Sequence, residues 1–442
     1  MNTTTNRSGN AIVIIGILFF VFGFVTWLNG TLIPFLKIAC QLENDIQAFF
    51  VTFAFYMAYF FLAIPSSYLL EKTGFKKGMA LGLVVMAAGS LVFIPAANSR
   101  SFGLFLTGLF IQGMGLALLQ TASNPYISIV GPIESAAKRI SIMGVCNKIA
   151  GILSPLVLGV LVMKNIGDIE AQLATATDAA ATNSILDAMA ARIITPYIVM
   201  AVVLCLLAVM IQKSSLPEID TDKEEPSVTQ EVRKKSVFQF PHLMLGVLCL
   251  FLYVGVEVMA GDAIAVYGRE LGLPLDETKY FTSFTLLAML IGYIIGIFTI
   301  PKYISQQKAL TISAVLGVLF TVGAFASKGY VAITFIALLG LANALMWPAI
   351  FPLAISGLGR FTKIGSALLV MGISGGALIP LLYATLKDKA ILSNHASFLV
   401  CMLPAYLYIL YYALKGFEAG KSKPSTPTKL RVAAGKKMQV TE

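Results

Sequence analysis

Long hydrophobic stretches dominate the chain, and short polar segments separate them. Each stretch is close to the roughly 20 apolar residues that a helix needs to cross a bilayer core of about 30 Å. The stretches are continuous, unlike the alternating segments of about ten residues that build a membrane β-barrel. We therefore predict twelve transmembrane helices, at 11–35, 46–70, 79–97, 102–131, 139–162, 193–212, 243–266, 279–300, 309–326, 330–356, 364–386 and 396–414.

The composition agrees with this pattern. Hydrophobic residues make up 57% of the 442 residues and charged residues only 12%, whereas soluble domains carry about 25% charged residues. This difference excludes an ordinary soluble enzyme and indicates an all-α polytopic membrane protein. The first stretch is too long for a removable signal peptide and lacks a small-residue cleavage site, so we expect it to stay in the membrane.

The positive charge of the chain follows its predicted topology. The net charge of +10 would, taken alone, be compatible with nucleic-acid binding. When the twelve helices alternate in direction, however, most Lys and Arg residues fall on the side of the N-terminus, while Asp and Glu divide evenly. Such a bias of the basic residues marks the cytoplasmic side of a membrane protein. We expect both termini in the cytoplasm and no nucleic acid as a partner.

The chain divides into two halves of six predicted helices. The longest polar interruption lies in the middle, and the segment 115–132 has a counterpart at 340–359. Two parallel six-helix repeats are typical of major facilitator transporters. We predict an N-terminal half, a cytoplasmic linker, a C-terminal half and a basic cytoplasmic tail, at 1–212, 213–241, 242–414 and 415–442.

Three ionisable residues are predicted to lie deep in the membrane, where a charge is costly and usually functional. Lys148 falls near the middle of its helix, and the glycines that flank Glu257 permit a helix break that opens the backbone to a cavity. Asp262 is expected nearer the outer surface, where it can face water. We expect Lys148 and Glu257 to meet across a central cavity, because a buried pair is tolerated better than two isolated charges. Ion coupling, a purely structural ion pair and snorkelling of Lys148 are alternatives.

Uncharged polar and aromatic side chains gather at comparable depth. They suit a polyhydroxylated ligand, because each hydroxyl donates and accepts a hydrogen bond and the C–H face of a sugar ring stacks on an aromatic ring. Gln120 and Asn124 share one helix face, as do Asn343 and Trp347. The alternative for each amide is a hydrogen bond that only joins two helices. The predicted substrate-binding residues are Trp27, Asn29, Gln120, Asn124, Asn147, Tyr253, Asn343 and Trp347.

The loop after the second predicted helix, PSSYLLEKTGFKKG (65–78), resembles the signature of the major facilitator superfamily at this loop. An acid at a cytoplasmic helix end can bind donors on a neighbouring helix and hold one closed state. The corresponding loop of the second half, 301–310, lacks the acid and the glycine, so we expect a one-sided latch. A plain basic loop is the alternative. The latch residues are Glu71, Lys72, Gly74, Lys76 and Lys77.

Four segments resemble the fucose/glucose/galactose branch of this superfamily: 23–37, 55–82, 118–151 and YVGVEV at 253–258. The resemblance implies the major facilitator fold, with twelve transmembrane helices in two pseudo-symmetric six-helix halves. It also implies a sugar–cation symporter of the bacterial inner membrane that works as a monomer, surrounded by lipid and without a cofactor or metal.

The chain departs from the fucose–proton transporters of this branch at two positions. They carry acids where this chain has Gly30 and Gln120, and neither of these can carry a proton. The difference favours a neutral hexose or N-acetylhexosamine (glucose, galactose or N-acetylglucosamine) over fucose. It also moves the expected coupling to H⁺ or Na⁺ onto Lys148 and Glu257, with Asp262 as a further candidate.

The function predicted from these observations is secondary active sugar import by alternating access. No GxxxxGK[ST] motif is present, so the energy would come from an ion gradient. An uncoupled facilitator is an alternative, because the two acids are missing. A membrane enzyme is less favoured, because neither histidine has acidic or histidine partners at ligand spacing and the five cysteines are scattered.

Overall fold

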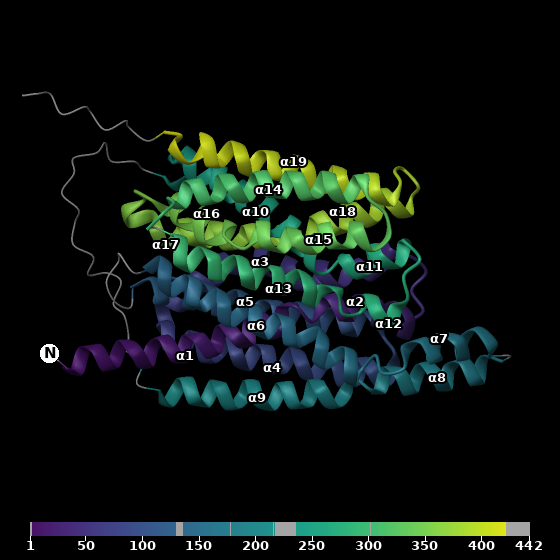
Figure 1. Ribbon diagram of the computed structural model, residues 1–442. Coiled ribbons are helices and arrows are strands. Elements are labelled where there is room, and N and C mark those ends of the chain that lie inside the picture. The colour runs from purple at the N-terminus through teal and green to yellow at the C-terminus, as the bar shows by residue number, and fades with distance from the viewer. Residues whose placement is uncertain are drawn as a thin grey trace, which may run out of the picture.

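The computed structural model describes residues 2–129, 136–176, 178–214, 216, 236–300 and 302–420. Within these ranges the regular structure is helical throughout. The helices form one elongated bundle, in which the start of α1 and the end of α19 lie at the same end, here called the terminal end (Figure 1). Twelve segments are long and apolar enough to cross a membrane, and they correspond to the twelve predicted stretches. The prediction of a multi-pass helical membrane protein is confirmed.

The first half supplies six of the spans. Two helices, α7 and α8, project from the bundle at the opposite end, here called the far end (Figure 1). The helices of this half are α1 (Asn2–Thr26), α2 (Asn29–Ala39), α3 (Asp45–Thr73), α4 (Phe75–Ser99), α5 (Phe102–Ile129), α6 (Ala136–Leu161), α7 (Ile166–Thr175), α8 (Ala179–Ala191) and α9 (Ile194–Lys213).

The second half supplies the other six spans. Three of its spans are assembled from shorter helices in sequence. Its helices are α10 (Pro241–Gly261), α11 (Ile264–Glu270), α12 (Leu275–Thr278), α13 (Phe281–Thr299), α14 (Gln306–Ala326), α15 (Gly329–Asn343), α16 (Met346–Ile355), α17 (Thr362–Met371), α18 (Gly375–Asp388) and α19 (Asn394–Leu414), with single 3₁₀ turns at η3 (Val237–Gln239), η4 (Gly359–Phe361), η5 (Gly372–Ser374) and η6 (Gly416–Glu418).

The predicted linker and tail fall largely outside the described residues. The linker prediction covers 213–241, of which residues 215 and 217–235 are not described, and the tail prediction covers 415–442, of which residues 421–442 are not described. The position of the domain boundaries therefore stays a prediction.

Several spans are interrupted within the bundle. The first span breaks between Thr26 and Asn29, and the seventh, the first of the second half, breaks after Gly261. The tenth breaks after Asn343, and the eleventh passes through η5. Interrupted helices at corresponding positions of two repeats are where transporters of this architecture place their binding sites. The sequence predicted only the break beside Glu257.

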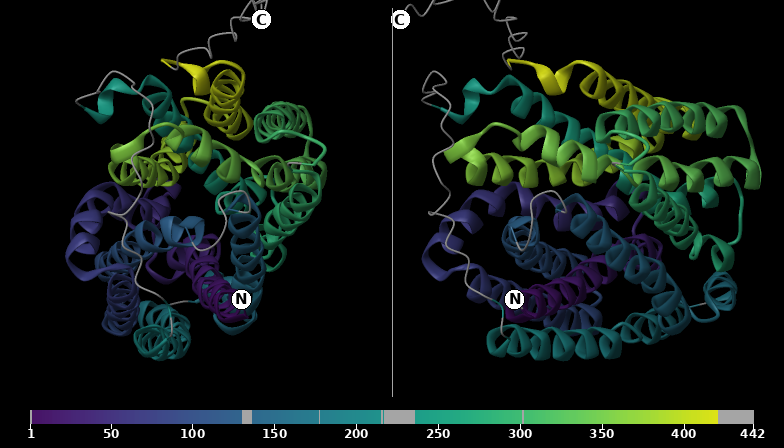
Figure 2. Two further views of the ribbon diagram at one scale, coloured as in Figure 1. Left: turned by 90° about the vertical axis from the view of Figure 1, so that its left-hand side faces the viewer. Right: turned by 60° about the vertical axis from the view of Figure 1, so that its left-hand side comes forward.

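The two halves pack face to face along the bundle (Figure 2). The principal contacts between them run from α6 to α13 and from α3 to α17 and α18. The outside of the bundle is apolar: Leu206 is 64% exposed and Phe298 72% exposed. In a soluble protein such a surface would favour aggregation, whereas in a bilayer it contacts lipid chains.

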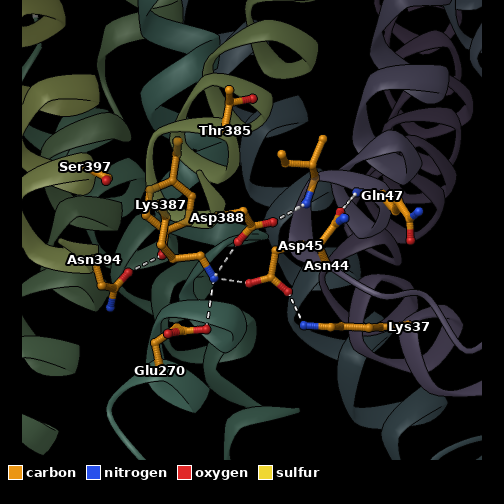
Figure 3. Close-up of polar contacts among 12 residues, drawn as sticks. Lys37, Asn44, Asp45, Gln47, Glu270, Thr385, Lys387, Asp388, Asn394 and Ser397 are labelled. Carbon is orange, nitrogen blue, oxygen red and sulfur yellow. Dashed lines mark hydrogen bonds and ion pairs between the residues drawn. The ribbon is translucent and has the colours of Figure 1, made fainter. Parts of the chain in front are cut away.

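A network of charges joins the halves at the far end (Figure 3). Asp45, at the start of α3, pairs with both Lys37 and Lys387. The Lys387 Nζ atom also lies 2.9 Å from an oxygen of Glu270 and 3.4 Å from an oxygen of Asp388. Asp45 and the two lysines therefore connect three helix ends, those of α2 and α3 in the first half and that of α18 in the second. The sequence analysis did not anticipate this network.

Glycine allows α1 to approach α6 closely. A Cβ atom added at Gly23 would lie 1.9 Å from the backbone oxygen of Asn147, well inside contact distance. The backbones of the two helices thus touch where the first span approaches its break.

We predict that Gly23→Ala destabilises the protein by about 1–3 kcal/mol, the usual cost of overpacking a close contact. The matched control is Gly103→Ala in α5, where an added Cβ meets nothing within 4 Å. Thermal unfolding of the purified proteins in detergent measures both. An unchanged Tm for Gly23→Ala, equal to that of the control, would contradict the close approach.

Candidate functional site

A cavity lies between the two halves at the level of the helix breaks. Both halves line it, and the walls combine aromatic rings, amides and one pair of charges. Its lining residues are Phe19, Phe22, Thr26, Trp27, Tyr56, Tyr59, Gln120, Asn124, Ile140, Gly144, Asn147, Lys148, Tyr253, Val254, Glu257, Tyr293, Trp347, Pro348 and Ile373. Six of the eight predicted substrate-binding residues are among them, namely Trp27, Gln120, Asn124, Asn147, Tyr253 and Trp347.

A buried ion pair spans the cavity. The Nζ atom of Lys148 on α6 lies 2.9 Å from the Oε1 atom of Glu257 on α10, and the two side chains are only 6% and 12% exposed. The predicted contact between these residues is confirmed, although their predicted role in ion coupling is not tested by geometry. Because the pair is neutral overall, it places donors and acceptors in the cavity without a net fixed charge.

The indole ring of Trp27 is held beside this ion pair. The Lys148 Nζ atom lies 4.4 Å from the centroid of the ring, a cation–π distance. A Cβ atom added at Gly151 would lie 2.5 Å from the ring, and one added at Gly261 would lie 2.3 Å from it. The two glycines therefore make room for the ring between α6 and α10, where Trp27 is only 2% exposed.

Two of the cavity amides, Gln120 and Asn147, are each anchored by a single hydrogen bond among the described residues. The Nε2 atom of Gln120 donates to the Tyr59 hydroxyl at 3.0 Å, and the Nδ2 atom of Asn147 donates to the backbone oxygen of Phe19 at 3.4 Å. A primary amide carries two donor hydrogens and an acceptor oxygen. Each side chain can thus be positioned by the protein and still bind a ligand hydroxyl.

Aromatic side chains complete the walls. Trp347 stacks on Phe351 with ring centroids 5.8 Å apart, and Tyr253 lies one turn before Glu257 and is only 1% exposed. Tyr56, Tyr59 and Tyr293 also line the cavity but were not predicted. Tyr56 and Tyr59 are spaced i,i+3 in an otherwise apolar span, a signal that could have identified them.

Two predicted substrate-binding residues lie outside the cavity lining. Asn343 is the last residue of α15, so the break separates it from Trp347 on α16, and the expectation of one shared face is wrong. Its Oδ1 atom instead accepts a hydrogen bond of 2.8 Å from the Tyr406 hydroxyl. Asn29 begins α2 just beyond the break in the first span and is completely buried.

Asp262 also differs from its prediction. It was predicted nearer the outer surface, at a position where it can face water, but it is 0% exposed. The cause is the break after Gly261, which turns the chain inward so that Asp262 approaches the first span. A Cβ atom added at Gly30 would lie 3.3 Å from the Asp262 Oδ1 atom.

The predicted latch lies at the terminal end between α3 and α4. Gly74 has a φ of +77° and ends α3, as the motif requires of a glycine. The Lys76 Nζ atom donates to the backbone oxygen of Ser214 at 2.7 Å, while Glu71, Lys72 and Lys77 are exposed. Glu71 forms no ion pair with another residue in the described ranges. Its role as a latch stays a prediction.

Comparison with known proteins agrees with this architecture. Residues 15–383 match the Major Facilitator Superfamily. The chain is 33% identical to a "Glucose/galactose transporter" of Brucella abortus (strain 2308), over 95% of this chain and 98% of that protein. It is 27% identical to the "L-fucose-proton symporter" of Escherichia coli (strain K12), over 84% of this chain and 86% of that protein.

Solved structures lead to the same fold. The crystal structure of the E. coli fucose:proton symporter superimposes with a TM-score of 0.72 at 25% identity, covering 92% of this chain and 98% of that one. The D-xylose-proton symporter structure shares the fold with a TM-score of 0.63 at 16% identity, covering 92% of this chain and 98% of that one. The chain belongs to the Major Facilitator Superfamily, in the branch that contains the glucose/galactose transporters and the fucose–proton symporters.

Proposed function

We propose that this protein imports a neutral hexose or N-acetylhexosamine of the glucose, galactose or N-acetylglucosamine type, coupled to H⁺ or Na⁺. It would work by alternating access as a monomer in the bacterial inner membrane, with both termini in the cytoplasm. The observation that carries the proposal is the cavity between the halves, where amides, aromatic rings and a neutral ion pair converge. The sugar transporters among its relatives support the substrate class.

The chemistry of the walls matches a sugar. Gln120, Asn124 and Asn147 offer amide donors and acceptors to ring hydroxyls, and Lys148 and Glu257 offer stronger, charge-assisted ones. Trp347 offers a ring face on which the C–H surface of a pyranose can stack, and Trp27, which is buried beside Lys148, contributes to the same wall. A charged substrate would leave an unbalanced charge in a buried cavity, which is costly. The walls therefore favour a neutral polyhydroxylated ligand.

An uncoupled facilitator is the second candidate. It is favoured by Gly30 and Gln120, which stand where the fucose–proton transporters carry acids. The two candidates differ in one property: only a symporter can accumulate sugar against its gradient.

The first test is sugar uptake by the purified protein in proteoliposomes. We expect saturable uptake and counterflow of glucose, galactose or N-acetylglucosamine, and accumulation when an inward H⁺ or Na⁺ gradient is imposed. Equilibration without accumulation under either gradient would favour the facilitator. Absence of counterflow for all three sugars would contradict the proposed substrate class.

A second prediction concerns the cavity amides. Gln120→Ala and Asn147→Ala should each weaken sugar binding about five- to hundredfold, because a buried hydroxyl that loses its partner costs about 1–3 kcal/mol. Calorimetric titration with the sugar measures the loss. The control is Gln112→Ala on the same helix, whose Nε2 atom donates to the Ser90 hydroxyl at 2.8 Å inside the first half. The Gln112→Ala variant should lower Tm and leave the sugar affinity unchanged. If Gln120→Ala and Asn147→Ala also bind sugar with the wild-type affinity, these two amides only join helices.

A third prediction concerns the ion pair. Removing one partner leaves the other charge buried and unpaired, so Lys148→Met and Glu257→Gln should each lower Tm more than the double variant does. Glu257→Gln should also lose accumulation but retain counterflow, since exchange requires only that the loaded carrier reorients. Additive effects on Tm would show that the residues act independently. Accumulation at the wild-type level by Glu257→Gln would remove its role in coupling.

A further inference from the structure

Two helices of the first half, α7 and α8, lie at the far end of the bundle (Figure 1). The helix α8 contacts α2 and α4 of its own half, whereas α7 contacts α12 of the second half. The pair therefore belongs to one half and touches the other. These two helices, Ile166–Thr175 and Ala179–Ala191, are here called the strap.

Two arginines anchor the strap to the first half. Arg100, which ends α4, lies 2.7 Å from the Asp187 Oδ1 atom and donates to the Asn183 Oδ1 atom at 2.6 Å, and both of these side chains are on α8. At the end of α8, Arg192 donates to the backbone oxygen of Lys164, just before α7, at 2.6 Å. The strap is therefore held on the first half and has to move with it.

An ion pair of the second half enters the connection between α6 and α7. The Lys279 Nζ atom lies 2.8 Å from the Asp276 Oδ1 atom and donates to the backbone oxygen of Met163, just beyond α6, at 3.2 Å. The other carboxylate oxygen of Asp276 lies against the first turn of α7, where a Cβ atom added at Gly167 would be 2.6 Å from it. Both signs are favourable, because a helix carries partial negative charge at its C-terminal end and partial positive charge at its N-terminal end.

A second ion pair lies on the exposed side of the strap. The Arg269 Nη2 atom on α11 lies 2.9 Å from the Glu170 Oε1 atom on α7, and the two side chains are 41% and 34% exposed. The next residue, Glu270, pairs with Lys387 in the network of charges that joins the halves at the far end. The end of α11 therefore contacts both the strap and that network.

These contacts can be released without leaving a buried charge unpaired. Lys279 is only 7% exposed but keeps Asp276 as a partner within its own half, and water can reach the Met163 carbonyl once the gap widens. Glu170 and Arg269 are partly exposed, and exposed ion pairs are weak. The strap thus contacts the second half through interactions that can form and break repeatedly.

We propose that the strap holds the far end closed and releases α12 each time that end opens. The inference rests on the proposed function, because alternating access requires the halves to rock about the cavity and part at this end. It deepens that function by naming the element that controls access to the cavity from the far side. Since α8 is anchored to the first half, the strap cannot follow the second half, and its contacts with α12 have to break.

The first experiment joins the strap to α12 covalently. A Cβ atom added at Gly167 would lie 3.8 Å from the Asp276 Cγ atom, within reach of a disulfide, whose Cβ atoms lie about 3.5–4.5 Å apart. The double variant Gly167→Cys/Asp276→Cys should therefore cross-link when it is oxidised in proteoliposomes. Sugar counterflow should then be lost and should return when the disulfide is reduced.

The wild type and the two single variants are the controls. Treated with the same oxidant, they should keep counterflow, which separates the cross-link from oxidation of the five native cysteines. Counterflow that persists in the cross-linked protein would overturn the strap, because α7 would not have to leave α12 during transport. Failure of the double variant to cross-link would overturn the contact itself.

The second experiment does not use sugar. Thr26 lines the cavity, so Thr26→Cys can be labelled by a maleimide that does not cross the membrane and is added at the far end, with labelling of the native cysteines subtracted. Adding Lys279→Met and Glu170→Gln should speed this labelling about tenfold or more, because a charge-assisted hydrogen bond and an ion pair that hold this end closed are removed.

Two further variants complete the labelling experiment. Glu170→Gln with Arg269→Gln alters only partly exposed side chains and should shift the labelling rate in the same direction by a smaller factor. The matched control is Lys328→Met, which removes an exposed lysine between α14 and α15 and should leave the rate unchanged.

The two experiments separate the strap from the proposed function. Faster labelling after release of the strap, in a protein without sugar counterflow, would support the strap and contradict the proposed substrate class. A labelling rate equal to that of Lys328→Met would overturn the strap, whether or not sugar is transported.

Discussion

The structure depends on how polar groups are satisfied where water is scarce. A membrane helix must pair its own backbone groups, and an ionised side chain at mid-depth needs a counter-charge. Lys148 and Glu257 meet this requirement through each other, at 2.9 Å and from opposite halves. This ion pair fixes the position of the cavity, because the halves must face each other at this level for either charge to be tolerated. Lys148 also lies over the indole ring of Trp27 and so helps to hold it.

The sequence predicted the parts of the fold that depend on hydrophobic pattern. The twelve spans, the pairing of Lys148 with Glu257 and the break beside Gly261 followed from run length, charge economy and glycine content. The other breaks were missed, although Gly30 and Pro348 lie close to two of them. Proline also occurs inside unbroken helices of this chain, such as Pro34 in α2 and Pro65 in α3, so such a residue does not mark a break by itself. Asn343 was misplaced for this reason: helical periodicity put it with Trp347, but the chain does not stay helical between them.

The far-end network shows a second limit of what can be predicted from the sequence. Lys37, Asp45 and Lys387 each follow or begin an apolar stretch, and alone each looks like an ordinary charged residue at a helix end. Their role depends on the contact between two helix ends that are 342 residues apart in the chain. At the same place Asp388 accepts a hydrogen bond of 2.7 Å from the backbone N–H of Ile46. No local pattern in the sequence predicts this contact. The amides of the cavity could be found because a polar side chain inside a long apolar span is conspicuous in the sequence.

The ion pair at the cavity and the far-end network have different consequences for movement. In the proposed mechanism the halves rock about the level of the cavity, so a contact at that level changes its distance least and Lys148 can stay paired with Glu257. The far-end network lies at the end of the lever and must separate when that end opens. Asp45 and Lys387, the ion pair that crosses between the halves, are only 3% and 9% exposed. Each also has a second partner in its own half, Lys37 and Glu270, and these are 39% and 42% exposed. Neither charge is therefore left unpaired when the halves part, and the network closes the far end without locking it. A buried pair without such second partners would be costly to separate, and Lys148 and Glu257, for which the described residues offer no second ion pair, lie near the pivot.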